Sequence, residues 1–507
     1  MSYQVVSIGG SGAKSAESLT HLCAAGLMPD GELNVMFVDP DKANGCLERA
    51  QNTLHKYREC EKIGMKGTGL LKTPITLSNP NVWTPFEEGT KPTLGNFFRY
   101  AALKTRDESG ALLFDVLFSP LEKEVLLDEG FLGHPSIGAA ALAKTVKLEE
   151  TEPWKTFRQK IDQDAKEGRS SKIILIGSVF GGTGAAGIPT IARLIKKEFK
   201  GYKNIKVGGV LLLPYFSFSA AEKLISEDRS FKLNPQNFVL NTQAALKYYY
   251  NQNYLDCFDC VYLMGEHMLT PVKHPTSGGR DQSNDPNFME LYAALAAVDF
   301  FKNIDEKVKD PIFEAQKYQL IAREEASEVL WTDLPDDNNG STIRNHLGTM
   351  TRFAFAYLHV YYPMLLDIMT KERTYRSPWY IQFFERKGIS LNNAQIQVQL
   401  NNMKDYCESF LKWMANLHKA NELLTISFAQ VKAFAKLEGK SMILLAPKDF
   451  DGDCFENLIL PMGKDYVNGL NDLWERMSDR KIEGPKEAAV GDFFKTLFEE
   501  SDVTKVN

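Results

Sequence analysis

The sequence predicts an α/β fold, with a parallel sheet flanked by helices over residues 1–304 and a largely helical α+β domain over residues 305–507. Short apolar runs alternate with helix-like segments in the first part, which is typical of parallel sheets. The runs are almost continuously apolar, as in strands that are buried on both faces. Glycine-rich stretches directly follow two of these runs, which places both at strand ends.

Five apolar runs predict the strands of this sheet. Ligands of such sheets bind beyond the carboxyl ends of the strands, so the residues that follow each run are candidates for a binding site. The five runs, in chain order, are Tyr3–Ile8, Asn34–Asn44, Lys172–Phe180, Val207–Phe216 and Phe258–Gly265.

The second half has a different pattern. Strand-like runs are few, and the clearest are Lys440–Pro447 and Asn457–Met462. Long segments with helical character dominate instead, which is why we expect a domain boundary near residue 305. These segments are Asp310–Trp331, Asn345–Leu365 and Ile396–Leu424.

Composition excludes several classes of protein. A net charge of −6, from 59 basic and 65 acidic side chains, gives no sign of a nucleic-acid binder. The most apolar segment, Phe353–Met369, contains His359, Pro363 and Asp367, and predicts a buried helix with a kink or stop rather than a membrane span. No secretory signal precedes the first strand, and seven scattered cysteines predict reduced thiols and a cytoplasmic location.

A CxxC pair, Cys257 and Cys260, lies at the start of the fifth strand. No second pair follows at zinc-finger spacing, so buried thiols are favoured over a zinc site.

The glycine loops carry the chemistry. "GGSGAKS" (Gly9–Ser15) and "GGTGAAG" (Gly181–Gly187) each lead from a strand into a helix. Without a Cβ, backbone N–H groups approach a phosphate closely, and the helix N-terminus adds positive potential. Two such loops on one sheet favour anion binding over a pair of tight turns.

Two common nucleotide motifs fit poorly. The P-loop pattern needs glycine before its lysine, but Ala13 precedes Lys14. A dinucleotide motif fits better, since Gly10-x-Gly12 follows a strand and Asp39 could bind a ribose hydroxyl. However, Ser15 replaces its third glycine, and this interpretation leaves "GGTGAAG" unexplained.

Five stretches together resemble the tubulin/FtsZ superfamily. "GGTGAAG" resembles its signature loop, and "SIGGSGAKSAESL" its first phosphate loop. "FVDPDKAN", "GFLGHPSIGAAAL" and "LLLPYFSFS" resemble the second and third loops and the proline loop beside the sugar. Their order and spacing agree with the family over about residues 3–300.

The resemblance implies a site for GTP or GDP with Mg²⁺. Lys14 either offsets phosphate charge or points to solvent, and we favour the second. His134 either contacts a phosphate or lies neutral on the surface, and the second is again favoured. The residues implied are Gly10, Ser11, Gly12, Ala13, Lys14, Asp39, Gly133, His134, Pro135, Gly181, Gly182, Thr183, Gly184, Ala185 and Pro214.

The family has a long core helix whose start contacts the base, and Asn284–Asn303 is the best match. Asn287 is the candidate base reader, with Asn284 next; an N-terminal helix cap is an equal alternative for either. Guanine and adenine both remain open.

The family's catalytic acids follow this helix. In "NIDEKVKD" (Asn303–Asp310), Asn303 and Asp305 match the pattern, but Val308 stands where the second acid belongs. Glu306 and Asp310 are close but out of register, and "DLPDD" (Asp333–Asp337) is another acidic candidate. A solvated acidic turn is the alternative.

The resemblance therefore implies a prokaryotic, cytoplasmic nucleotide-binding protein that hydrolyses GTP at a subunit interface. It also implies head-to-tail self-association into oligomers or filaments. Two alternatives remain: an NAD- or FAD-dependent oxidoreductase, and a non-hydrolysing nucleotide sensor or scaffold of the same fold.

Overall fold

The computed structural model describes most of the chain. The described residues are 1–65, 69–86, 92–128, 130–131, 133–145, 151–218, 235–266, 269–272, 279–280, 282–309, 318–321, 331–336, 340–371, 377–420, 429–438, 441–459 and 468–505.

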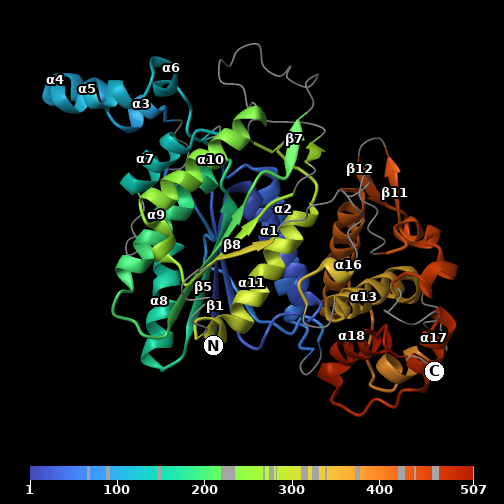
Figure 1. Cartoon of the computed structure of the whole chain (residues 1–507). Helices are drawn as coiled ribbons and strands as arrows, with labels where there is room; N and C mark the ends of the chain where they lie inside the picture. Colours follow the sequence, from blue (N-terminus) through green and yellow to red (C-terminus); the bar gives the residue numbers. More distant parts are fainter. Residues whose placement is uncertain are drawn as a thin grey trace.

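A parallel sheet forms the centre of the first part (Figure 1). Its strand order is β10-β8-β6-β5-β1-β2-β3, with β4 also paired to β2, and each pair is parallel. The predicted parallel sheet is confirmed. The strands are β1 (Ser2–Ile8), β2 (Glu32–Val38), β3 (Ile75–Thr76), β4 (Val82–Trp83), β5 (Ser171–Ser178), β6 (Ile205–Leu212), β8 (Cys260–Met264) and β10 (Tyr318–Ile321).

Helices cover both faces of the sheet, which explains the continuously apolar strands. Neighbouring residues of one strand enter opposite cores; Ile174, for example, faces the first set of helices and Ile173 the second. The first face carries α1 (Gly9–Ala24), α2 (Gly45–Glu61) and α11 (Phe288–Lys307). The second carries α7 (Pro135–Thr145), α8 (Trp154–Lys166), α9 (Gly182–Glu198) and α10 (Pro235–Asn251).

The second half packs against α1 and α2 (Figure 1). Trp413 donates its indole N–H to Ser18 Oγ at 3.2 Å, and His21 contacts the Tyr406 hydroxyl at 3.1 Å. Both halves therefore share one core. The elements are α13 (Ser341–Ala356), α14 (Tyr362–Lys371), α15 (Pro378–Tyr380), α16 (Ala394–Ala420), β11 (Ala435–Glu438), β12 (Ser441–Leu444), α17 (Leu470–Asp479) and α18 (Ala489–Glu500).

Some helix and strand predictions for the second half are wrong. Tyr318–Ile321, within a predicted helix, is strand β10 and pairs with β8. The sheet thus receives its edge strand from beyond residue 305, although the domain boundary itself stays a prediction. Of the predicted strand Asn457–Met462, the described part, Asn457–Ile459, forms a turn and bend, and the rest lies outside the described residues.

Phe353–Met369 is helical and interrupted, as predicted. A π-helical turn, Tyr357–Tyr361, joins α13 to α14 just before Pro363. Proline lacks the N–H that a regular helix would use there, which accounts for the local widening. In the described part of the chain, no helix combines the length and apolar character needed to span a membrane.

An arm interrupts the first part between β4 and α7. It contains α3 (Leu94–Phe97), α4 (Tyr100–Arg106), α5 (Glu108–Leu117) and α6 (Pro120–Lys123), and α4 and α5 project away from the sheet (Figure 1). A small parallel pair, β7 (Phe216–Phe218) with β9 (Thr270–Val272), lies outside the main sheet.

Candidate functional site

The two glycine loops follow neighbouring strands. β1 and β5 pair in register, with Ile8 opposite Gly177 at their carboxyl ends. The chain then leaves β1 into α1 on one face of the sheet and leaves β5 into α9 on the other. This reversal is a topological switch point, where ligands of doubly wound sheets bind.

Both helices begin without a side-chain cap. Ile8 precedes α1 and Gly181 precedes α9, and neither accepts a hydrogen bond with its side chain from the first turn. The first N–H groups of a helix have no intrahelical acceptor. By contrast, α2 and α11 are capped by the side chains of Asn44 and Asn287. The two uncapped helix starts therefore offer N–H donors and positive potential at one edge of the sheet.

Gly9 brings the two loops together. Its φ is +71°, a left-handed conformation that favours glycine. A Cβ at Gly9 would lie 3.4 Å from the Cβ of Thr183, so the first and the signature loops are in contact.

The other three loops meet at the same edge. A Cβ at Gly10 would lie 3.5 Å from Asn44 Nδ2, in the second loop. In the third loop, Phe131 packs against Gly182, where an added Cβ would come within 2.7 Å of the Phe131 Cβ. Beyond β6, the Tyr215 hydroxyl oxygen lies 3.1 Å from Ser11 Oγ, whose hydroxyl can donate to it. All five stretches of the resemblance thus converge.

Three glycines of these loops are required by packing. A Cβ at Gly12 would lie 2.6 Å from the Ile176 carbonyl oxygen, and one at Gly184 only 2.2 Å from the Ser178 carbonyl oxygen. Gly182 is closed by Phe131 in the same way. Gly10 and Gly181 have more room, because their nearest neighbours are the side chains of Asn44 and Ser178. Ala13 and Ala185 are buried.

Lys14 does not point to solvent, which corrects the favoured prediction. It is buried and forms an ion pair with Glu290, at the start of α11. The Tyr215 hydroxyl donates to Glu290 Oε1 at 2.6 Å. Burial opposes the charge of Lys14, but Glu290 and Tyr215 raise its pKa above the ordinary value. This buried group joins the first loop to the core helix.

A second, partly buried ion pair continues from this one. Arg49 of α2 donates Nε to Glu17 Oε2 at 2.8 Å, one turn along α1 from Lys14. Arg49 Nη1 also donates to the carbonyl of Asn284 at 2.8 Å, which anchors the segment before α11. Asn284 therefore contacts Arg49 through its backbone carbonyl.

Asp39 lies at the end of β2 and is buried. Its Oδ1 accepts the backbone N–H of Asp41 at 3.0 Å. Burial raises the pKa of Asp39 to about 8; the hydrogen bond from the Asp41 backbone works against this, and the charge of Asp41 adds to it. Asp41 Oδ2 accepts the backbone N–H of Gly279 at 2.6 Å, so this loop is tied to the segment before α11.

The third loop is held by a residue that the sequence did not single out. Asn241 of α10 donates Nδ2 to the Gly133 carbonyl at 3.0 Å. His134 is half-buried, with Nδ1 3.9 Å from Glu122 Oε1. Burial lowers the pKa of His134, and Glu122 partly offsets this. Pro135 begins α7, and Pro214 precedes Tyr215 in the loop after β6.

Asn287 acts as a helix cap. Its Oδ1 accepts the N–H of Met289 at 2.9 Å, and Glu290 Oε2 accepts the N–H of Asn287 at 2.6 Å. This reciprocal pattern is a capping box. The cap alternative therefore describes Asn287, while base reading stays a prediction.

Asn303 and Asp305 lie far from the glycine loops. α11 extends to Lys307, so both residues are in its last turns and not in a following loop as expected. Asp305 Oδ2 pairs with Lys172 Nζ at 2.8 Å, at the amino end of β5. About 22 Å of helix separates Asp305 from Glu290. Asn303 Nδ2 donates to Asp299 Oδ1 at 2.8 Å.

In the described part of the chain, no hydrogen bond or ion pair joins Glu306, Cys257 or Cys260 to the glycine loops. Asp310 and Asp337 lie outside the described residues, and Glu306 pairs with Lys309 at 2.7 Å. Cys260 is buried and Cys257 partly buried, and both are free thiols whose pKa is raised by burial. No group of three or more metal-binding side chains occurs among the described residues.

Sequence reasoning missed Tyr215, Glu290, Glu17 and Arg49. The signal for them was their position: Glu17 and Tyr215 lie within two of the five stretches, Arg49 lies shortly after another, and Glu290 lies in the predicted core helix. Their partners are distant in sequence, so spacing could not reveal the contacts.

Comparisons with known proteins do not identify a family for this chain. No family model matches the chain, and no curated protein matches it. CetZ from Methanosaeta thermophila strain DSM 6194 is a similar solved structure, with 11% identity and a TM-score of 0.28, covering 62% of this chain and 58% of that one. CetZ2 from Haloferax volcanii, in a GTPγS-bound protofilament, has 14% identity and a TM-score of 0.28, covering 60% and 59%. The chain spans less than two thirds of each. Function must be inferred from the loops themselves.

Proposed function

We propose that this chain is a tubulin/FtsZ-like nucleotide-binding protein. The observation that carries the proposal is the meeting of two uncapped helix starts at the switch point between β1 and β5. Each start supplies N–H donors to the same edge of the sheet, and a polyphosphate offers acceptor oxygens to both at once. The sequence of all five converging loops supports the same family.

GTP with Mg²⁺ is the proposed ligand. The first turns at Gly10–Ala13 and Gly181–Ala185 would bind phosphate oxygens through backbone N–H groups, and Thr183 would add its hydroxyl. Mg²⁺ supplies charge neutralisation of the phosphates when bound. Asp39 is the nearby carboxyl that would face the cation or the ribose; its raised pKa means that it holds a proton near neutral pH until a positive charge approaches.

Hydrolysis would need a second copy of the chain. Asp305 lies at the amino end of β5, whereas the glycine loops follow its carboxyl end. An acid at this position cannot reach the phosphates of its own chain. Head-to-tail association brings the amino edge of one copy to the carboxyl edge of the next, where Asp305 would orient a water molecule. Asn303, two residues before Asp305 in α11, would help to orient the same water molecule.

A non-hydrolysing scaffold is the second candidate, and one observation favours it. Asp305 is engaged with buried Lys172, and Val308 replaces the second acid. Such a protein would bind nucleotide and assemble without turnover. An NAD- or FAD-dependent enzyme shares the strand order but gives no role to "GGTGAAG".

Identification of the nucleotide that co-purifies with the protein tests the proposal. Protein is denatured, and the released small molecules are separated by anion-exchange chromatography and weighed by mass spectrometry. We expect GDP or GTP near one equivalent per chain. Release of NAD or FAD would replace the proposal with the oxidoreductase.

A further inference from the structure

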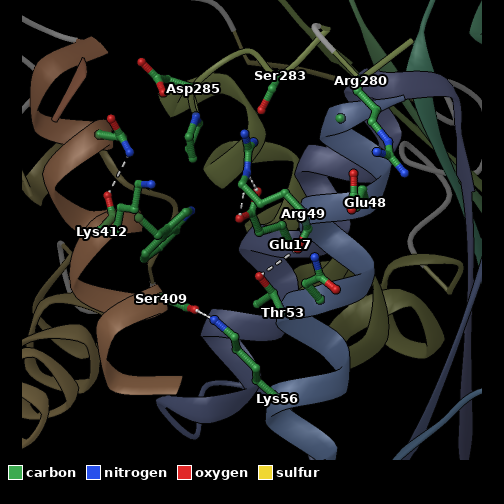
Figure 2. A pocket seen from close by; sticks show the side chains of 15 residues that line it. Glu17, Glu48, Arg49, Thr53, Lys56, Arg280, Ser283, Asp285, Ser409 and Lys412 are labelled. Carbon is green, nitrogen blue, oxygen red and sulfur yellow. Dashed lines mark hydrogen bonds and ion pairs between the residues drawn. The ribbon is translucent and has the colours of Figure 1, made fainter. Parts of the chain in front are cut away.

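A pocket of about 390 Å³ lies between the two halves of the chain, on the α2 side of the sheet (Figure 2). Its walls come from α1, α2, the segment before α11, and α16 of the second half. Volumes of this size are typical of small-molecule sites. The lining includes Glu17, Glu48, Arg49, Lys56, Arg280, Asp285, Lys412, Trp413 and Asn416.

Some charged side chains of this pocket have a partner of opposite charge and others do not. Glu17 is buried and neutralised by Arg49. In the described part of the chain, Lys56, Arg280 and Lys412 have no carboxylate partner. Lys56 donates to Ser409 Oγ at 2.6 Å. Figure 2 shows Lys412 and Ser409 on α16 across from Thr53 and Lys56 on α2. With the Glu17–Arg49 pair set aside, cations exceed the remaining carboxylates, Glu48 and Asp285.

Two buried polar atoms in the pocket wall also lack partners. Arg49 uses Nε and Nη1, but its Nη2 has no acceptor within the described residues. Asn416 is 3% exposed and donates Nδ2 to the Lys412 carbonyl at 3.0 Å, while its Oδ1 has no donor in the same part of the chain. Unsatisfied buried polar groups are costly and rare. The two atoms leave room for an acceptor near α2 and a donor near α16.

We propose that this pocket binds a small organic oxyanion, a phosphate or carboxylate that also carries a hydroxyl or amide donor. Arg49, Lys56 and Lys412 provide the donors for the anionic group, and charge-assisted hydrogen bonds of this kind are the strong ones. Arg280, exposed at the same pocket, adds a further guanidinium donor. Asn416 accepts from the ligand's neutral donor. Glu48 and Asp285 also line the pocket; they discourage a second negative group and so favour a ligand with one anionic end.

The bound anion would hold the two halves of the chain together. Its contacts come from α2 on one side and α16 on the other, and Gly45 of the pocket directly follows Asn44, which lies against Gly10. The inference does not depend on the proposed nucleotide site, because none of the pocket residues belongs to a glycine loop.

Two probes separate the ligand sources: inorganic phosphate and lactate, a monocarboxylate with one hydroxyl, each at millimolar concentration, with sodium chloride matched in ionic strength. We measure thermal unfolding and calorimetric binding of the full chain. At least one probe should raise Tm beyond the chloride control, since binding only to the folded state stabilises it. Lys412→Ala and Arg280→Ala should weaken the effective probe by about tenfold or more. Both residues are exposed, so these variants should fold.

Matched controls decide where the anion binds. Lys404→Ala changes the same helix outside the pocket and should leave binding unchanged. Gly10→Asp blocks the first glycine loop and should also leave it unchanged. Binding that is lost in Gly10→Asp but kept in Lys412→Ala would assign the anion to the glycine loops and overturn the proposal. No shift with either probe would overturn it as well.

Discussion

Lys14 of α1 and Glu290 of α11 form an ion pair that is fully enclosed by protein, with Tyr215 bound to Glu290 and to Ser11. Through these contacts, the first glycine loop is linked to the start of the core helix. If nucleotide binding moves the loop that contains Ser11, these contacts would transmit the movement to the start of α11. Asp305 lies at the other end of this helix.

Removal of one partner of this pair should be strongly destabilising. Lys14→Met leaves the Glu290 carboxylate buried without its cation, which typically costs about 3–5 kcal/mol. The double variant Lys14→Met/Glu290→Gln should recover most of this loss, because no uncompensated charge remains. Urea unfolding measures both. Lys309→Met, which breaks the exposed pair with Glu306, is the control and should change little. Equal losses in the single and double variants would argue against the buried pair.

Asp39 should make stability depend on pH. Its pKa is raised to about 8 by burial, so between the ordinary carboxyl range and pH 8 the folded protein holds a proton that the unfolded chain releases. The contribution to stability is present in full below about pH 4 and is lost as pH rises towards 8. Asp39→Asn should flatten this part of the profile, measured by urea unfolding at several pH values. An unchanged slope in the variant would assign the dependence to other groups.

The glycines of the signature loop should differ in their tolerance of a side chain. Gly184→Ala forces a Cβ against the Ser178 backbone and should cost at least about 1–3 kcal/mol. Gly181→Ala meets only the Ser178 hydroxyl and should fold normally. Gly182→Val is a poor test of nucleotide binding, because it would collide with Phe131 in the fold itself. Similar Tm values for Gly184→Ala and wild type would contradict this packing.

Catalysis, if present, should depend on Asp305 from the neighbouring copy. Asp305→Asn keeps the shape of the side chain and should lower GTP turnover by about 10²-fold without weakening GTP affinity. A mixture of this variant with Gly10→Asp should regain part of the activity, since one interface then has an intact acid and an intact loop. Phosphate release at several protein concentrations measures this. No turnover by wild-type protein at any concentration would favour the non-hydrolysing scaffold.

The central strands could be predicted because they are buried on both faces, which leaves an uninterrupted apolar run in the sequence. β10 could not, since Tyr318–Ile321 is short and lies in a charged segment with helical periodicity. Its strand state depends on pairing with β8, a contact between residues more than fifty positions apart. The local sequence pattern does not indicate pairing between residues so far apart.

The glycine loops of the site could be predicted from the sequence. The ion pairs between residues that are distant in the sequence could not. The two glycine loops follow from strand ends and glycine content, the other three are implied by the family resemblance, and the structure brings all five together. The Lys14–Glu290 pair joins residues far apart in the chain, so the surface lysine that the sequence favoured was a reasonable but wrong interpretation. Asn287 had two equal interpretations, and only its hydrogen bonds distinguish the cap.

Equilibrium binding of a fluorescent GTP analogue to nucleotide-free protein tests the phosphate site itself. Gly10→Asp places a carboxylate in the first loop, where Asn44 leaves room for the side chain, and should weaken binding by at least about a hundredfold while Tm stays near wild type. The matched control is Gly201→Asp, at an open position near the amino end of β6, which should bind as wild type does. Equal affinity of wild type and a folded Gly10→Asp would contradict nucleotide binding at the glycine loops.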